Sequence, residues 1–292
     1  MALRGMRCRV EQDRRETMPK LELPQPENDG YLIPVVGEHS RSKHYYLSHY
    51  MQAFSIAMQR KRWSSLHYVD LFAGAGIVEL EDSRELSWGS PLIAAQIEPR
   101  IDRIHACEAD PRKLEALSFR LGRLSHRKNP QLLCGDANVE VSKIVSAIPP
   151  RSLTLAFLDP YGLHLGYETV RLLSTRRCDL IIYFPDRVDV LRNWRMNYHE
   201  DRESNLDRVL GTGEWRTIFE TRSKGNWVKE LRDLYITQLG KLGYTTFRFI
   251  RIQAVGRPLY QLIFCSKADV AAKIWDGISK IQPDRQRLLI PD

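Results

Sequence analysis

The sequence contains no run of about eighteen consecutive apolar residues, the length that a helix needs to cross a bilayer. Residues Met1 to Arg15 carry arginines with no apolar stretch behind them, so they do not form a secretory signal. Internal repeats and low-complexity tracts are also missing. With 43% hydrophobic residues among 292, the chain can bury a sizeable core. We therefore expect a globular cytoplasmic protein without contact to a membrane.

Cysteine is scarce and scattered along the chain. The five cysteines are Cys8, Cys107, Cys134, Cys178 and Cys265, and no two of them form a Cys-x-x-Cys pair. Metal sites and disulfide frameworks need clustered or regularly spaced cysteines. We therefore expect no metal site, and thiols that are buried or half-buried in a reducing compartment.

Acidic residues are missing between Glu38 and Asp70, where positive charges and aromatic rings alternate. The residues concerned are Arg41, Lys43, Arg60, Lys61 and Arg62, with Tyr45, Tyr46, Tyr50, Phe54 and Trp63. A second basic cluster comprises Arg120, Arg123, His126, Arg127 and Lys128. Such interleaving is typical of nucleic-acid binding, and the net charge of +8 favours an anionic partner. A solvated helix face would show the same pattern, so both interpretations stay open.

Five short apolar segments alternate with helical patterns in the middle of the chain. The expected strands cover residues 66–71, 101–107, 131–134, 153–158 and 180–184. The expected helices begin at Ser90 as N-cap, at Asp110, after Cys134 and at Tyr167, and a polar loop over 79–88 interrupts the pattern. The alternation predicts an α/β fold with a doubly wound, right-handed parallel sheet.

The rest of the chain surrounds this core. We expect a mobile tail over 1–29, and a helical cap over 30–65 whose helix runs from Ser42 to about Gln59, capped by Ser40 or Ser42. The core covers 66–185, and an inserted helical lobe rich in arginine covers 186–225. Residues 226–292 are expected to add a helix ending before Gly243, an antiparallel hairpin over 245–252 and 259–265, and a closing helix over 268–281.

Four of the expected strands end in an acidic residue. These residues are Asp70, Glu108, Asp136 and Asp159, and a glycine-containing turn, Gly74-Ala75-Gly76, follows the first. Because parallel strands end at the same edge of a sheet, the acids are expected to lie together. Packing alone does not explain this repetition, which indicates a site for a nucleotide-like ligand.

Particular motifs extend this interpretation to a family. Four motifs of this chain carry a resemblance. They are Asp70-Leu-Phe-Ala-Gly74-Ala-Gly76, Gly89-Ser90-Pro91, Phe157-Leu158-Asp159-Pro160-Tyr161-Gly162-Leu163 and Lys43-His44-Tyr45-Tyr46-Leu47. They resemble the three-Cys-motif partner family, TcmP, within the class I S-adenosylmethionine-dependent methyltransferases. The resemblance covers roughly Tyr45 to Ile281. It implies a Rossmann-like sheet of five parallel strands with a terminal antiparallel hairpin, S-adenosylmethionine as cofactor, and a partner of the radical iron–sulfur type.

The resemblance also implies roles for the residues at this edge. Asp70 would hold the cofactor's ammonium group directly or through water, Glu108 its ribose hydroxyls and Asp136 its adenine amine. The expected cofactor-binding residues are Asp70, Phe72, Ala73, Gly74, Gly76, Glu108, Ala109, Asp136 and Ala137. Two alternatives stay open: acids at strand ends also cap helices, as Asp110 and Asp136 could, and Gly76 could be required by packing.

The Asp159-Pro160-Tyr161-Gly162 segment resembles the Asp-Pro-Pro-Tyr sequence of enzymes that methylate amino groups of nucleic acids, with one proline fewer and the tyrosine one place earlier. We expect Asp159, Pro160 and Tyr161 to be catalytic, with Asp159 or His164 as proton acceptor. Lys43, His44, Ser90 and His164 are expected on the substrate side, although His164 could equally be a loop residue without a role.

Two functions follow from these patterns. The first is methyl transfer to a nucleic acid or a nucleotide-like anion, and the alternative is a non-catalytic, cofactor-binding partner or sensor that works with a three-Cys-motif protein. An NAD-dependent Rossmann enzyme is disfavoured because the turn lacks the third glycine of that fingerprint.

Overall fold

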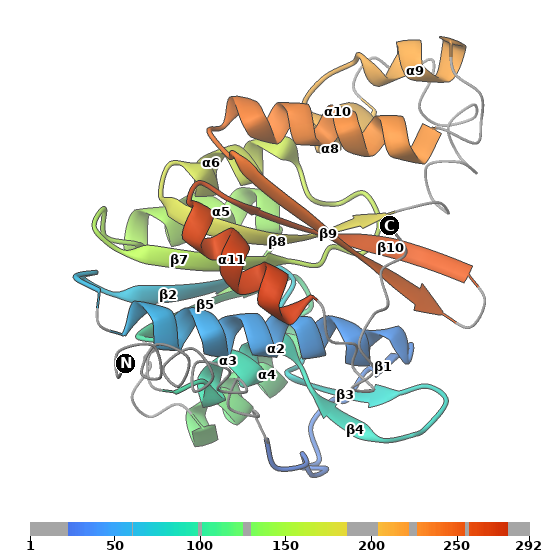
Figure 1. The fold of residues 1–292 in the computed structure, drawn as a ribbon. Helices are drawn as coiled ribbons and strands as arrows, with labels where there is room; N and C mark the ends of the chain where they lie inside the picture. The colour runs from blue at the N-terminus through green and yellow to red at the C-terminus, as the bar shows by residue number, and fades with distance from the viewer. Residues whose placement is uncertain are drawn as a thin grey trace, which may run out of the picture.

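A seven-stranded sheet forms the centre of the protein (Figure 1). The computed structural model describes residues 23–59, 61–98, 101–124, 130–185, 204–221, 227–254 and 257–279. The strands are β2 (Leu66–Asp70), β5 (Arg103–Glu108), β6 (Gln131–Cys134), β7 (Leu153–Leu158), β8 (Arg177–Pro185), β9 (Thr246–Ala254) and β10 (Arg257–Ser266). Their order is β6-β5-β2-β7-β8-β10-β9, with β10 antiparallel to both neighbours and the first five strands parallel. The expected fold class, five parallel strands and a C-terminal hairpin, is confirmed.

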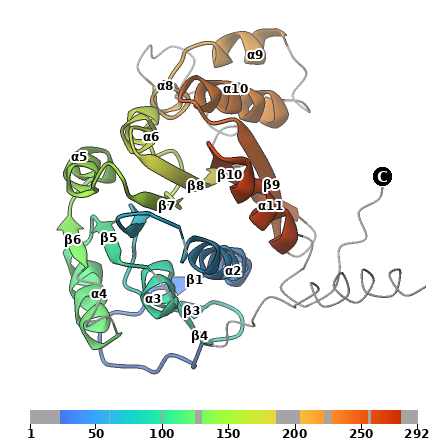
Figure 2. The ribbon, with the colours of Figure 1, turned by 60° about the vertical axis from the view of Figure 1, so that its left-hand side comes forward.

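Helices cover both faces of the sheet (Figure 2). On one face pack α2 (His39–Met58), α3 (Ser90–Gln96), α4 (Pro111–Leu124) and α11 (Asp269–Ile278). On the other pack α5 (Ala137–Ala147), α6 (Tyr167–Ser174), α8 (Asn205–Leu210), α9 (Trp215–Thr221) and α10 (Trp227–Lys241). Tyr68 and Val69, adjacent on β2, join opposite clusters, as the two-residue period of a strand requires. The sheet is therefore buried on both faces, which explains its nearly continuous apolar strands.

The polar loop expected over 79–88 is in fact a hairpin, so that expectation is wrong. Strands β3 (Ile77–Leu80) and β4 (Leu86–Trp88) pair antiparallel, and β1 (Val35–Val36) adds to β3 in parallel. The two end residues of β3 are buried, whereas its central residues are only half-buried. The buried apolar residues Ile77 and Leu80 lie in a segment that also contains several charged residues, so the sequence did not show the alternating pattern of a strand.

Two expected helix caps are also corrected. Helix α2 begins at His39 after Glu38, so Ser40 lies inside the helix and neither it nor Ser42 caps it. Helix α3 begins at Ser90 itself, with Gly89 as the N-cap. The side chain of Ser90 forms a tertiary hydrogen bond instead, which is described below with the site.

The end of the expected N-terminal tail is packed against the core. The indole N–H of Trp88 donates to the carbonyl of Pro24 at 2.5 Å, and Asp29 forms an ion pair with Arg120. Residues 1–22 of that tail, 186–203 and 222–226 of the expected lobe, and 280–281 of the closing helix lie outside the described residues. The described helices of the lobe, α8 and α9, join the core cluster through Leu206 and Trp215.

Within the described ranges, no helix is long and apolar enough to cross a bilayer. No group of three or more His, Cys, Asp or Glu side chains is arranged to hold a metal ion in that same part of the chain. The thiols described are Cys107, Cys178 and Cys265, which are buried, and Cys134, which is exposed.

Candidate functional site at the carboxyl edge of the sheet

The four acidic residues lie along one edge of the sheet. Asp70 and Glu108 are the last residues of β2 and β5, while Asp136 and Asp159 closely follow β6 and β7. These four strands are neighbours in the order β6-β5-β2-β7 and run in parallel. The register of β2 places Asp70 opposite Ala106 of β5 and Phe157 of β7. Parallel pairing therefore brings the acids to one edge, as the sequence predicted.

Asp70 is enclosed at the end of β2. Its side chain is 0% exposed, and its Oδ2 accepts hydrogen bonds from the Tyr68 hydroxyl at 2.9 Å and the Ser90 hydroxyl at 2.5 Å. Its Oδ1 accepts the backbone N–H of Phe72 at 3.2 Å. The carboxylate thus fixes both the start of the glycine turn and the first turn of α3. Direct contact with an ammonium group stays a prediction.

Burial also changes how Asp70 titrates. Loss of solvation raises its pKa to about 6, although the hydrogen bonds from Ser90, Tyr68 and Phe72 oppose that shift. The nearby carboxylate of Asp159 adds to the rise through charge repulsion. A buried aspartate with two hydroxyl donors and one amide donor suits an anchoring role.

The turn after β2 is bound to the end of β5. The N–H of Gly74 donates to Oε2 of Glu108 at 2.8 Å, and the N–H of Ala73 donates to the carbonyl of Cys107 at 3.0 Å. Gly74 has φ +64°, and a Cβ placed there meets nothing within 4 Å. The turn thus faces open space beside the half-buried Glu108 carboxylate.

Gly76 is required by packing. It has φ +87°, and a Cβ there would lie 2.9 Å from Leu92 and 3.0 Å from Leu117. Its carbonyl accepts the N–H of Gly89 at 2.6 Å, which brings the turn against the residue preceding α3. The packing alternative therefore describes the structure at this glycine, and contact of Gly76 with a ligand remains a prediction.

Asp136 is the N-cap of α5. Its Oδ1 accepts the backbone N–H of Asn138 at 2.8 Å, which satisfies one of the free amides at the start of that helix. Asp136 and Ala109 are both exposed, whereas Ala137 is buried as the first residue of α5. The capping alternative is thus realised, and the other carboxylate oxygen remains available for a ligand.

Asp159 is held by a side chain from the N-terminal helix. Nζ of Lys43 on α2 donates to its Oδ2 at 2.5 Å, and both side chains are largely buried. Pro160 is buried, whereas the ring of Tyr161 is 91% exposed. Beside them, Pro160, Gly162, Tyr183, Phe184 and Tyr235 contribute to an apolar crevice beyond β7 and β8. The side chains of Asp159 and Lys43 therefore meet next to an apolar surface.

The other substrate-side residues are spread out. His44 follows Lys43, and burial, with the neighbouring lysine charge, lowers its pKa to about 4. His164 is exposed, and its backbone carbonyl accepts a hydrogen bond from Asn138. Ser90 donates its hydroxyl to Asp70, so it lies at the end of β2 rather than beside Asp159. The sequence prediction grouped these residues together, but the structure brings only Lys43 against the Asp159 loop.

Two residues that matter at this edge escaped the sequence analysis. Tyr68 lies two residues before Asp70, and the two-residue period of a strand placed it on the same face. Arg120 was expected in an exposed basic cluster, yet it is 3% exposed and donates to both carboxylate oxygens of Asp29, at 2.7 and 2.8 Å. It also donates to the carbonyl of Ala75 at 2.7 Å, in the middle of the glycine turn. No local signal separated Arg120 from the exposed basic residues.

Comparison with known proteins gives distant likenesses of shape. No family model and no curated protein matches the sequence. Protein LPL1258 from Legionella pneumophila has a TM-score of 0.49 at 12% identity, covering 80% of this chain and 91% of its own. An O-methyltransferase from Bacillus cereus in complex with SAH has a TM-score of 0.42 at 11% identity, covering 75% and 80%. TYW2 from M. jannaschii in complex with AdoMet has a TM-score of 0.33 at 12% identity, covering 74% and 75%. Likenesses this distant assign no role, so the proposal below rests on the residues of the edge.

Proposed function

We propose that this protein is an S-adenosylmethionine-dependent methyltransferase of the TcmP type. The cofactor would lie at the carboxyl ends of β2, β5 and β6, and the methyl acceptor beyond β7. The observation that carries the proposal is the open space at Gly74 beside the Glu108 carboxylate, with Asp136 and Asp159 on the flanking strands. The strand order, with β10 antiparallel between β8 and β9, is also the architecture that the sequence resemblance implies.

The residues at this edge fit such a cofactor. Each oxygen of Glu108 accepts one backbone N–H, from Gly74 and from Asp110, which leaves each a further lone pair for a ribose hydroxyl. No Cβ at Gly74 obstructs close approach to the turn, and one carboxylate oxygen of Asp136 faces solvent beside it. When bound, S-adenosylmethionine supplies a methyl group on a positively charged sulfur.

The chain's own residues would orient the acceptor and exclude water. The Lys43 ammonium donates to Oδ2 of Asp159 and fixes the orientation of that carboxylate, so its other oxygen can accept a hydrogen bond from an acceptor's N–H or O–H. The exposed ring of Tyr161 offers a surface for a flat apolar group. Positioning of this kind supplies most of the rate when the leaving group is already activated.

The proposed acceptor is a nucleic acid or a nucleotide-like anion. The net charge of +8 favours an anionic substrate, and Tyr161 offers a ring for stacking on a base. The TcmP resemblance adds a three-Cys-motif protein as partner, and a cytoplasmic location is part of the same proposal.

A second candidate function follows from the contact at Asp159. Its Oδ2 is already engaged by Lys43 at 2.5 Å, which satisfies part of the carboxylate without an acceptor. A non-catalytic, cofactor-binding partner or sensor of a three-Cys-motif protein has no methyl acceptor to bind, so in it the contact between Lys43 and Asp159 would serve only to hold the structure together. Transfer of tritium from labelled cofactor to bulk nucleic acid or lysate separates the two functions, because only an enzyme transfers the label.

Calorimetry with S-adenosylmethionine tests the cofactor site. Glu108→Ala is expected to weaken binding about 10- to 100-fold, the effect of losing hydrogen bonds to a charged group. Glu115→Ala on the exposed surface of α4 removes the same charge and is expected to leave binding unchanged. Equal affinities for both variants, or no binding by the unaltered protein, would overturn the assignment.

A further inference from the structure

Positive charge gathers at the edge of the sheet opposite the candidate site. Lys61 and Arg62 precede β2, Arg151 precedes β7, and Arg176 and Arg177 lie where β8 begins. The strands β2, β7 and β8 are consecutive in the sheet and run in parallel, so the loops before them meet at the amino-terminal edge. We call these five residues the basic edge.

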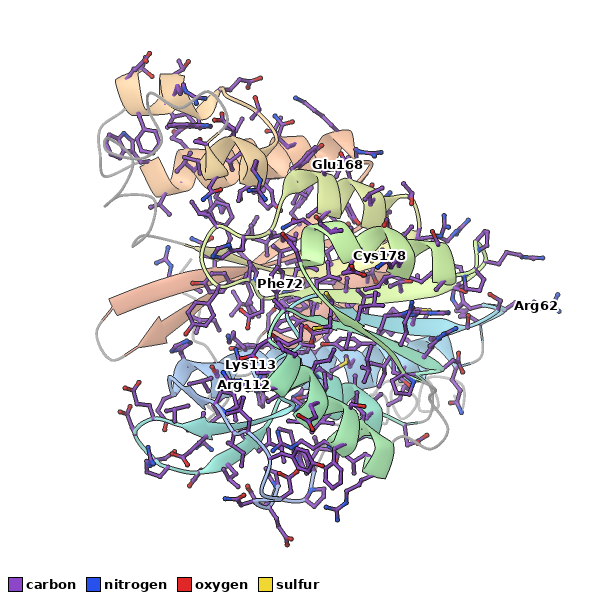
Figure 3. All side chains as sticks on the ribbon, turned by 180° about the vertical axis from the view of Figure 1, so that it is seen from behind. Arg62, Phe72, Arg112, Lys113, Glu168 and Cys178 are labelled. Atoms are coloured by element: carbon purple, nitrogen blue, oxygen red, sulfur yellow. The ribbon has the colours of Figure 1, made fainter. Side chains whose placement is uncertain are left out.

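Backbone contacts hold the three loops of the basic edge together. The N–H of Ser64 donates to the carbonyl of Arg151 at 3.2 Å, and Leu153 is paired in register with Leu66 on one side and Arg177 on the other. Figure 3 shows Arg62 pointing away from the molecule at this edge, whereas Phe72 lies toward the opposite one. The backbone segments that carry these charges are therefore neighbours at this edge.

The basic residues outnumber the acids at this edge, where the carboxylate of Asp102 accepts the backbone N–H of Leu66. Within the described part of the chain, none of its five residues forms an ion pair with a carboxylate, whereas Lys143, Arg171 and Lys229 on the covering helices each pair with one. Asp179, which lies near the start of β8, is buried and bonded to the hydroxyls of Tyr50 and Ser266. An unpaired cluster of this kind attracts polyanions.

The neighbouring groups suit phosphates rather than bases. The hydroxyls of Ser64, Ser65 and Ser152 cluster there, with Oγ–Oγ distances of 2.7 and 3.1 Å. Ser152 is buried and Ser65 also bonds His67, so the exposed Ser64 is the member of this group that can reach a phosphate. The guanidinium of Arg177 lies over the ring of Trp63 at 5.4 Å, so this ring is covered rather than open for stacking on a base. Lys, Arg and Ser side chains are the usual contacts to the phosphate backbone, which carries no sequence information.

From this arrangement we infer that the basic edge binds the phosphate backbone of a nucleic acid, independently of its sequence. The inference deepens the proposed function, on whose nucleic-acid acceptor it rests, by placing the docking surface away from the methyl donor. The six residues of β7 separate the two edges by about 20 Å. A bound duplex must therefore extend past about six base pairs, at about 3.4 Å each, to reach both edges.

Fluorescence anisotropy with a labelled DNA duplex of about 24 base pairs tests the inference over a range of salt concentrations. The triple variant Lys61→Gln, Arg62→Gln, Arg151→Gln removes three exposed charges whose side chains form no hydrogen bond or ion pair within the described residues. It is expected to bind about 100-fold more weakly at 0.1 M salt, and to reduce the slope of log affinity against log salt by about 2.7. Arg177→Gln is a second variant, which keeps the charges of Lys61, Arg62 and Arg151 and is expected to lower the affinity less than the triple variant does.

A matched control carries Lys241→Gln, Arg251→Gln and Lys273→Gln, which lower the net charge equally from exposed positions without breaking an ion pair within the described residues. It is expected to keep most of the affinity and nearly the full salt slope. Equal losses in both triple variants, or no duplex binding by the unaltered protein at low salt, would overturn the inference.

Calorimetry with S-adenosylmethionine on the same proteins separates this inference from the proposed function. Loss of duplex binding in the basic-edge variant with an unchanged affinity for the methyl donor supports both. If the unaltered protein binds no donor but its duplex binding depends on the basic edge, the methyltransferase proposal fails and the docking surface stands.

Discussion

Asp70 and Asp179 are two buried aspartates with nearly the same surroundings. Asp70 is 0% exposed and accepts hydrogen bonds from the hydroxyls of Tyr68 and Ser90. Asp179 is 6% exposed and accepts hydrogen bonds from the hydroxyls of Tyr50 and Ser266. Burial raises the pKa of each to about 6. By local chemistry alone, the two carboxyl groups cannot be told apart.

Their positions in the sheet separate them. Asp70 ends β2, accepts the backbone N–H of Phe72 just before the glycine turn, and feels the charge of Asp159, at the edge where parallel strands end. Asp179 lies near the beginning of β8 and ties that strand to α2 and to the last residue of β10. A perturbed pKa therefore does not by itself locate a site. The open space at Gly74, on the turn that follows Asp70, is the observation on which we propose the site.

The largest expected effect concerns Arg120, which supports the Asp70 side only. Arg120→Met leaves Asp29 as an unpaired buried charge and releases the carbonyl of Ala75, so the free energy of unfolding should fall by about 3–5 kcal/mol. Urea unfolding measures this, and calorimetry should show weaker donor binding with partial recovery in Arg120→Lys. Arg216→Met breaks a more exposed pair with Asp207 and should cost less. Equal costs would contradict the structural role given to Arg120.

The pH dependence of stability should show how alike the two aspartates are. Each has a folded-state pKa of about 6 against 3.8 unfolded, so the folded protein retains a proton that the unfolded chain loses between about pH 4 and 6. Each carboxyl therefore lowers the free energy of unfolding as pH rises through that window. Asp179→Asn removes this effect, and its stability relative to the unaltered protein should grow by up to about 3 kcal/mol from pH 4 to 7.

Two histidines change stability in the opposite direction and serve as an internal control. Burial lowers the pKa of His67 and of His105, paired at 2.8 Å between Nδ1 and Nε2, to about 4. Their neutral forms stabilise the fold above the unfolded value of 6.5, and this contribution is lost as pH falls toward 4. This histidine contribution is the same in the unaltered protein and in Asp179→Asn, so it cancels when their free energies of unfolding, from urea titrations at pH 4, 5.5 and 7, are subtracted. A difference that does not change with pH would contradict the raised pKa of Asp179.

Binding should then distinguish the two aspartates. Asp70→Ala removes the anchor of the turn and is expected to weaken S-adenosylmethionine binding about 10- to 100-fold. Asp179→Ala leaves two hydroxyls unpaired in the same way and should lower stability without changing that affinity. Calorimetry on both variants, at a temperature and urea concentration at which each is still folded, measures this difference in affinity. If Asp70→Ala and Asp179→Ala lost the same affinity for S-adenosylmethionine, the proposal that the cofactor binds at the Asp70 edge would be contradicted.

The smallest expected effects come from the tyrosines. Tyr68→Phe and Tyr50→Phe each remove one hydroxyl from a buried carboxylate, at a cost of about 1–2 kcal/mol in the free energy of unfolding. Only Tyr68→Phe should also weaken donor binding, by a few-fold, because only Asp70 orients the glycine turn. A reversed order of the two affinities would point to Asp179 as the functional carboxyl.

Most strands could be predicted from the sequence, because their apolar runs are local. The expected bounds of β6 and β7 and the expected start of α6 agree with those observed. The hairpin at 77–88 was missed because its charged residues hide two apolar anchors. Spacing alone placed Asp70, Glu108, Asp136 and Asp159 at one edge, since parallel strands end together.

Sequence by itself determined the sheet, the edge at which the acids gather and the turn that faces open space. Only the tertiary structure decided how each acid is held: Ser90 on Asp70, Lys43 on Asp159, and Arg120 inside the core rather than in a basic surface. The physical reason is distance along the chain. Periodicity reports which neighbours share a face, but contacts between residues 20, 116 and 45 positions apart depend on how whole elements pack.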